Sequence, residues 1–122
     1  MFFWHERRGG IDVAITDRHG GVSSAPFGEL NLARHVGDEP AAVEANRVAV
    51  AAELGLPAER LVFMDQCHGA TVEVIDGPWQ GDPPACDAVI TRASDLALVV
   101  MVADCVPVLL SAILASRAGR AQ

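Results

Sequence analysis

The sequence lacks the features that several broad classes of protein require. It contains no cluster of basic residues, and its formal net charge is −7 over 122 residues. Nucleic acids and anionic membrane surfaces both attract basic proteins, so we expect neither as the main partner. The three cysteines are odd in number and follow no framework spacing, which argues against disulfides and favours reduced thiols in the cytoplasm.

Apolar runs long enough for export or for crossing a membrane are also missing. Residues 1–8 include aromatic side chains, but imidazole and charged side chains follow them, so the apolar stretch of a signal peptide is absent. The longest apolar stretch, 96–114, is interrupted by Asp104 and Pro107. Hydrophobic residues make up 51% of the chain, which is enough for a core, and we expect a single domain over residues 1–122.

Two sequence signals that are common in enzymes do not occur either. Gly20 and Gly21 lack the spacing and the strand-to-helix setting of a phosphate-binding loop. No nucleophile elbow is present. Chemistry is therefore expected, if anywhere, from the histidine and cysteine residues.

The first half of the chain predicts one strand, one long loop and one helix. Ile11 to Thr16 alternates apolar and polar residues, as in a half-buried strand. Residues 17–40 are rich in glycine, serine, proline and asparagine, and ordered loops this long usually serve a site. A helix is expected from about Pro40 to Leu54, with Asp38 capping its start and Gly55 following its end.

The second half of the chain predicts short strands. They are expected at residues 61–64, 71–75, 88–91, 96–102 and 106–114. The last two are almost entirely apolar, which is typical of strands buried on both faces. Strands outnumber the single helix, so the residues alone predict an α/β or α+β domain.

His68 and Cys105 are the main candidates for chemistry, because histidine and cysteine can bind zinc or act as a base and a nucleophile. His68 precedes Gly69 in a turn between two expected strands, although turn histidines more often bind a backbone carbonyl. Cys105 follows Asp104 where an apolar run breaks, and the alternative is a small buried thiol. A carboxylate in such a run needs a cation, a metal or hydrogen-bond donors, which favours a site.

Asn46 and Arg47 are the candidates for binding an anion or a ribose. Arg47 lies on the apolar stripe of the expected helix. Its guanidinium is expected to extend to solvent, to bind an anion, or to pair with Glu44 or another surface carboxylate. His35, in the long loop, is a further candidate, although loop histidines are usually solvated.

The order of six motifs is more specific than any one of them. The motifs occupy residues 16–23, 30–38, 46–47, 66–69, 87–91 and 103–110, and they include the sequences TDRHGGVS, QCHG and ADC. Together they closely resemble the YfiH-like family, which is also called the laccase-domain or multicopper polyphenol oxidoreductase family. The resemblance extends from about residue 11 to residue 110.

This resemblance implies an α+β fold in which mixed β-sheets are layered with outer helices, as in cysteine-hydrolase-like proteins. It also implies a zinc-dependent purine nucleoside phosphorylase, which cleaves adenosine, inosine or methylthioadenosine with phosphate and in some members deaminates adenosine. His68 and Cys105 match two of the family's three metal ligands, and with Asp104 they are the predicted catalytic residues. The predicted substrate-binding residues are Asn46, Arg47, His35 and Gln66.

The chain departs from the family pattern after Leu110. The family's third metal ligand is a histidine beyond the Asp-Cys strand, whereas residues 111–122 contain no histidine and form an atypical tail. We therefore expect the N-terminal portion of a YfiH-like domain that ends early, with an exposed sheet edge through which it can self-associate. Cys67 also stands where a small aliphatic residue is usual.

Two other functions are compatible with the resemblance. The laccase name implies copper-dependent oxidation of phenols, but a multicopper site needs many histidines, and the four in this chain are scattered. A non-catalytic remnant is the third possibility, because a metal site with two protein ligands is weak and open to solvent.

Overall fold

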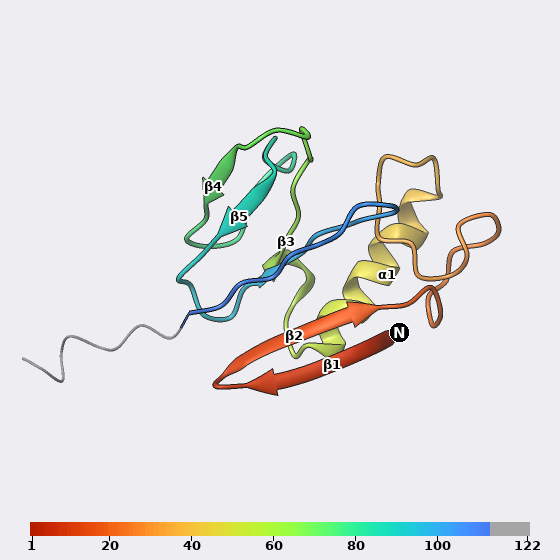
Figure 1. Cartoon of the computed structure of the whole chain (residues 1–122). Coiled ribbons are helices and arrows are strands. Elements are labelled where there is room, and N and C mark those ends of the chain that lie inside the picture. The colour runs from red at the N-terminus through yellow and green to blue at the C-terminus, as the bar shows by residue number, and fades with distance from the viewer. Residues whose placement is uncertain (113–122) are drawn as a thin grey trace, which may run out of the picture.

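A computed structural model describes residues 1–112 of the chain. The described residues form three two-stranded sheets and one α-helix, with one short 3-10 helix, η1 (Ala58–Arg60). Figure 1 shows the helix and strand β3 between an N-terminal hairpin and a second pair of strands. The predicted α+β class with mixed sheets is confirmed.

The hairpin joins β1 (Phe2–Arg8) to β2 (Ile11–Thr16) in antiparallel register, with Arg8 opposite Ile11. Gly9 and Gly10 form the turn between them, and both have positive φ, at 58° and 80°. Glycine adopts such angles without steric cost, which suits a two-residue hairpin turn. The bounds of β2 agree with the prediction, whereas β1 was not predicted, because its residues show no alternation of apolar and polar types.

Helix α1 (Pro40–Glu53) begins at the predicted residue and ends one residue before the predicted end. Its N-cap is Glu39, which makes no side-chain capping bond, so the predicted cap at Asp38 is wrong. At the other end, the N–H of Leu56 donates to the carbonyl of Ala51 at 2.9 Å. Gly55, with φ of 73°, donates to Ala52 at 3.0 Å, which completes a Schellman motif.

The core lies between α1 and a parallel pair made of β3 (Leu61–Val62) and β6 (Ala97–Leu98). Residues from both elements bury their side chains in one cluster, and partly buried apolar residues pack around it. The cluster consists of Ala51, Leu61 and Phe63, with Leu32, Leu54, Ala58, Ala97, Val99 and Met101 against it. The cluster therefore joins the helix, the long loop and the C-terminal half of the chain.

A third pair is formed by β4 (Val72–Val74) and β5 (Ala88–Ile90), which run parallel with Val72 opposite Ala88. A parallel bridge between Asp65 and Ala85 extends this contact toward the core. Cys86, the next residue, is fully buried. The segment that contains His68 is therefore held at both of its ends by contacts with residues 84–90.

The two apolar strands predicted at 96–102 and 106–114 are wrong as buried strands. Only Ala97–Leu98 is a strand, and the side chains of Val106, Val108 and Leu110 are 85%, 71% and 93% exposed. Among residues 1–112 no strand pairs with residues 106–112, so this segment has no ladder partner. Residues 113 and 114 lie outside the described part. Figure 1 shows that the chain extends beyond β6 and then turns back.

Within the described residues, no helix combines the length and the apolar character needed to cross a membrane.

Candidate functional site

The turn around His68 is organised by one carboxylate, that of Asp87. Asp87 Oδ1 accepts the backbone N–H of Cys67 at 3.1 Å, and Oδ2 accepts that of Thr71 at 3.2 Å. His68 itself has a positive φ of 58°, which is uncommon for a residue other than glycine. The turn thus holds the exposed His68 in a left-handed conformation between two hydrogen bonds to the same side chain.

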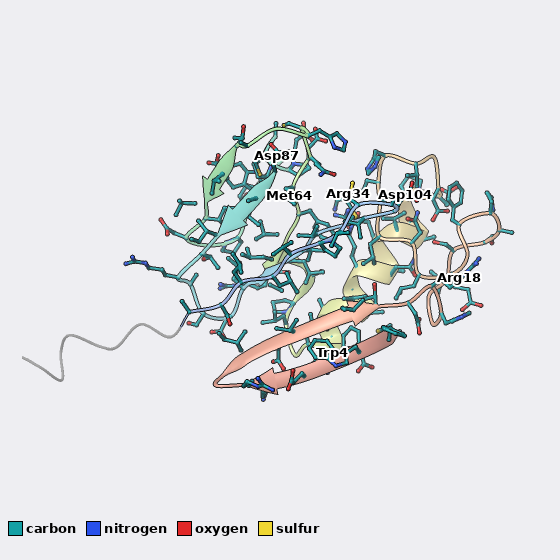
Figure 2. The ribbon with its side chains drawn as sticks, in the orientation of Figure 1. Trp4, Arg18, Arg34, Met64, Asp87 and Asp104 are labelled. Carbon is teal, nitrogen blue, oxygen red and sulfur yellow. The ribbon has the colours of Figure 1, made fainter. Side chains whose placement is uncertain are left out.

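The negative charge of Asp87 suits it to accept the backbone hydrogen bonds of the turn. Hydrogen bonds from backbone N–H groups, foremost that of Gly69, lower the pKa of the Asp87 carboxyl below its usual value. Figure 2 shows Asp87 at the start of β5, facing the top of the molecule. Asp87 belongs to one of the six motifs, but no role was predicted for it, although an aspartate directly before a strand is the signal that could have indicated one.

Asp104 and Cys105 lie in a bend, Ala103 to Cys105, and Figure 2 shows Asp104 where the chain turns back after β6. Both side chains are exposed. The bend agrees with the predicted break in the apolar run. Asp104 does not need the cation, metal or hydrogen-bond donors that the apolar run predicted for it, because Asp104 and the nearby Val102 and Val106 are all exposed.

The donors available for a metal do not form a complete zinc site within residues 1–112. No three side chains of His, Cys, Asp or Glu gather there in a way that could hold an ion. His68 and Cys105 are two donors on separate exposed turns, whereas zinc is held by at least three protein ligands in known sites. The described residues therefore do not fit a zinc ion by themselves.

Asn46 is buried, with 1% of its surface exposed, and all of its polar atoms bind the chain itself. Its Nδ2 donates to the hydroxyl of Ser23 at 2.9 Å and to the carbonyls of Glu29 and Asn31 at 3.0 and 2.9 Å. Its Oδ1 accepts the N–H of Val22 at 2.8 Å. This side chain fastens the long loop to helix α1, which leaves no free polar atom for a ribose.

Asp38 completes the same network from the other side of the loop. Its Oδ2 accepts hydrogen bonds from Ser23 Oγ at 2.6 Å and Asn31 Nδ2 at 3.0 Å. These bonds, led by the one from Ser23, lower the pKa of the Asp38 carboxyl. The carboxylate that was predicted to cap the helix therefore closes the loop.

Arg47 is also buried, and its guanidinium has an unexpected partner. Nε and Nη2 donate to the backbone carbonyl of Leu32 at 2.9 and 2.6 Å, and the guanidinium carbon lies 3.6 Å from the centre of the Phe63 ring. Burial lowers the pKa of Arg47 to about 10, so it remains charged at neutral pH. The predicted pairing with Glu44 is wrong, because Glu44 binds Arg34 at 2.6 Å.

The other two predicted substrate-binding residues, His35 and Gln66, are exposed on loops. Within residues 1–112 neither side chain makes a hydrogen bond or an ion pair. Both side chains are accessible to a ligand, and the assignment of His35 and Gln66 as substrate-binding residues stays a prediction.

These observations define a class of protein: a small α+β domain in which a polar loop is fastened to one helix, and a carboxylate-held histidine turn and an Asp-Cys bend are exposed. A family model described as multi-copper polyphenol oxidoreductase laccase matches residues 12–121. The chain therefore belongs to this family, the YfiH-like family.

Curated relatives of the chain carry the name purine nucleoside phosphorylase. The chain is 56% identical over 105 residues to purine nucleoside phosphorylase ORF3 of Streptomyces griseus, a match that covers 84% of this chain and 43% of the relative. It is 49% identical over 107 residues to a purine nucleoside phosphorylase of Mycobacterium tuberculosis, with the same shares covered. The chain thus spans less than half the length of the curated relatives that it matches.

Solved structures give the same result for the fold. Neisseria meningitidis protein NMB0706 matches with a TM-score of 0.70 and 34% identity, over 85% of this chain and 42% of that one. The Bacillus licheniformis protein YfiH matches with a TM-score of 0.61 and 28% identity, over 71% of this chain and 36% of that one. The sheets and helix described above are therefore those of this family.

Proposed function

We propose that this chain carries part of the site of a purine nucleoside phosphorylase, which cleaves a nucleoside such as adenosine, inosine or methylthioadenosine with inorganic phosphate. The observation that carries the proposal is the His68 turn held by Asp87, on a chain 56% identical to a relative named for this activity. Phosphate and a purine nucleoside are the proposed small-molecule partners, and the cytoplasm is the proposed compartment.

In this proposal the exposed residues meet the ligand and the buried ones position them. His68, Asp104 and Cys105 face solvent and supply the imidazole, carboxylate and thiol groups of the site. Asn46 and Arg47 act as positioning residues, because their donors are committed to the loop that carries His35. His68 and Cys105 are two of the ligands that we propose for zinc. A third ligand must come from outside residues 1–112, so no step of the reaction is assigned to the metal.

The test is phosphate-dependent release of adenine from adenosine by the purified chain. We expect His68→Ala and Cys105→Ser each to reduce the rate by about a hundredfold or more, since each removes a reacting group. His19→Ala and Cys67→Ser are the matched controls, because both residues are exposed and neither side chain is given a role in the proposed site. A chain that neither releases adenine nor binds adenosine would contradict the proposal and favour the non-catalytic remnant.

Metal content tests the zinc component separately. With two donors among the described residues, we expect the purified chain to hold less than one zinc per molecule and to lose it readily to a chelator. Stoichiometric zinc that persists in Cys105→Ser would show that Cys105 is not a ligand.

Copper-dependent oxidation of phenols is the second candidate, favoured by the description of the family model. Its weakness is the donor set, because the described residues gather no group of three potential metal ligands. Phenol oxidation that disappears with chelator and returns with copper but not with zinc would establish it.

We also propose that the exposed apolar arm, defined here as residues 106–110, lets two copies of the chain associate. Large apolar side chains that stand this far out of the surface are unusual in monomers. A second copy of the chain can cover the arm by forming backbone hydrogen bonds with the unpaired N–H and C=O groups of residues 106–110.

A further inference from the structure

The long loop contains a second polar feature that the proposed site does not use, which is a cavity of about 310 Å³. Its walls come from two stretches of the loop, which Asn46 holds together. The lining residues are Arg18, Ser23, Ala25, Pro26, Gly28 and Glu29. Arg18 is exposed and lies at the edge of the molecule in Figure 2.

The guanidinium of Arg18 is placed without a counterion. It lies close to Gly28, because a Cβ on that glycine would come within 2.5 Å of Nη2. Within residues 1–112 the Arg18 side chain makes no ion pair and no hydrogen bond. A guanidinium that lines a cavity without an acceptor is a ready site for an oxyanion.

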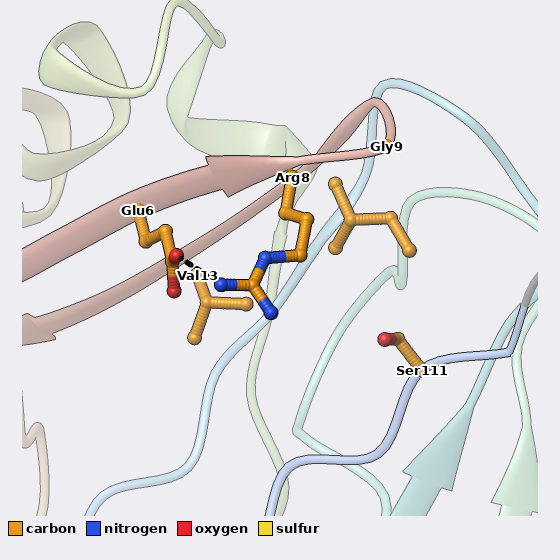
Figure 3. A pocket seen from close by; sticks show the side chains of 6 residues that line it. Glu6, Arg8, Gly9, Val13 and Ser111 are labelled. Atoms are coloured by element: carbon orange, nitrogen blue, oxygen red, sulfur yellow. Dashed lines mark hydrogen bonds and ion pairs between the residues drawn. The ribbon is translucent and has the colours of Figure 1, made fainter.

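A second cavity, of about 250 Å³ at the hairpin tip, provides the contrast. It is also lined by an arginine, Arg8, but there Nη2 donates to Glu6 Oε1 at 2.8 Å, as Figure 3 shows. The charge of Arg8 is therefore compensated by its neighbour. An anion has less to gain at Arg8 than at Arg18.

Glu29, on the wall of the Arg18 cavity, is held in place by its surroundings. Its φ of 134° is unfavourable for a residue with a side chain, and such strain gathers at functional sites. Its carbonyl accepts the N–H of Ser23 at 2.9 Å, and its Oε2 accepts the N–H of Gly20 at 2.9 Å. The second carboxylate oxygen, Oε1, makes no hydrogen bond with the described residues.

We propose that this cavity binds inorganic phosphate, with Arg18 donating to its oxygens and Glu29 accepting its O–H. Phosphate at neutral pH carries a proton that it can donate to a carboxylate, whereas sulfate carries none and would be repelled. The pair therefore selects phosphate over sulfate. The proposal rests on the proposed function, since phosphate is the second substrate of a phosphorolytic cleavage, and it moves the anion-binding role from Arg47 to Arg18.

Titration of the purified chain with phosphate and with sulfate at constant ionic strength, followed by calorimetry, tests this site without nucleoside or metal. We expect phosphate to bind at least tenfold more tightly than sulfate, and Arg18→Met to weaken phosphate binding at least tenfold. Arg8→Met, which removes the same charge at the other cavity, should change it less than twofold. Glu29→Gln should bring the two anions within about twofold, because an amide can donate to either.

Circular dichroism shows whether each variant folds. Arg18→Lys is a second variant, which keeps the positive charge but loses the planar guanidinium, and it should bind phosphate with intermediate affinity. Equal binding by wild type and Arg18→Met, equal affinity for sulfate, or no phosphate binding by the wild type would each overturn the proposal. Phosphate binding by a chain that neither releases adenine nor binds adenosine would contradict only the proposed function. Adenine release without phosphate binding at Arg18 would contradict only this site.

Discussion

The long loop and the apolar arm differ in how their composition relates to their packing. The loop is polar, yet it is fixed because one buried side chain, Asn46, satisfies four of its partners. The arm at 106–110 is almost entirely apolar, yet it stands in solvent because no strand among residues 1–112 pairs with it. A hydrophobic sequence is thus not sufficient for burial, which also requires a surface to pack against.

Removing the centre of the loop network should have the largest effect on stability. Asn46→Ala would leave the part-buried N–H of Val22 and carbonyl of Asn31 without partners, and the carbonyl of Glu29 would keep only its bond from Ser23, so we expect a loss of about 3 kcal/mol in the free energy of unfolding. Urea denaturation measures it. Gln66→Ala, an exposed control, should change the same quantity by less than about 0.5 kcal/mol. Equal effects of the two variants would mean that the loop does not depend on Asn46.

Substitutions in the arm should change self-association and leave the free energy of unfolding unaffected. Val106→Lys combined with Leu110→Lys places charges where the proposed copy packs, so self-association should weaken at least about tenfold. Val48→Lys, at an exposed apolar position on α1, is the control. Sedimentation velocity over a range of concentrations measures the effect. If the wild-type chain is monomeric throughout, the proposed association is wrong.

The His68 turn should respond to pH through Asp87. Because its pKa is lowered in the folded chain, the stabilisation is present above the unfolded pKa of about 3.9 and is lost as the pH falls through the folded value. Hydrogen exchange of the Thr71 amide reports this loss. In Asp87→Asn we expect the amide to exchange about tenfold faster at neutral pH, with no added change in the acid range. An unchanged exchange rate in the variant would remove Asp87 as the organiser of the turn.

The smallest effect is expected at Arg47. Arg47→Met keeps much of the side-chain volume and removes a buried charge, but loses the bonds to Leu32 and the contact with the Phe63 ring. These terms oppose one another, and we expect a net loss of about 1 kcal/mol in urea denaturation. Phosphate affinity should not change. A weakening of phosphate binding would return the anion-binding role to Arg47.

Local patterns predicted the elements that depend on local chemistry. The alternation of Ile11–Thr16 and the proline and glycine around α1 gave both elements to within one residue. The partner of Arg47 was not predictable, because Leu32 is distant in sequence and offers only a backbone carbonyl, which every residue has. For the site, the sequence indicated that His68 lies in a turn but not that Asp87 holds it, since their contact joins separate segments.

The buried position of Cys86 divides the three thiols into two kinds. Cys67 and Cys105 are exposed, whereas burial shields Cys86 and raises the pKa of its thiol. An alkylating reagent should therefore consume two thiols quickly and the third only when the Asp65–Ala85 bridge opens. The rate at which Cys86 is alkylated in the unmodified chain therefore reports how often the Asp65–Ala85 contact, which supports the His68 turn, opens.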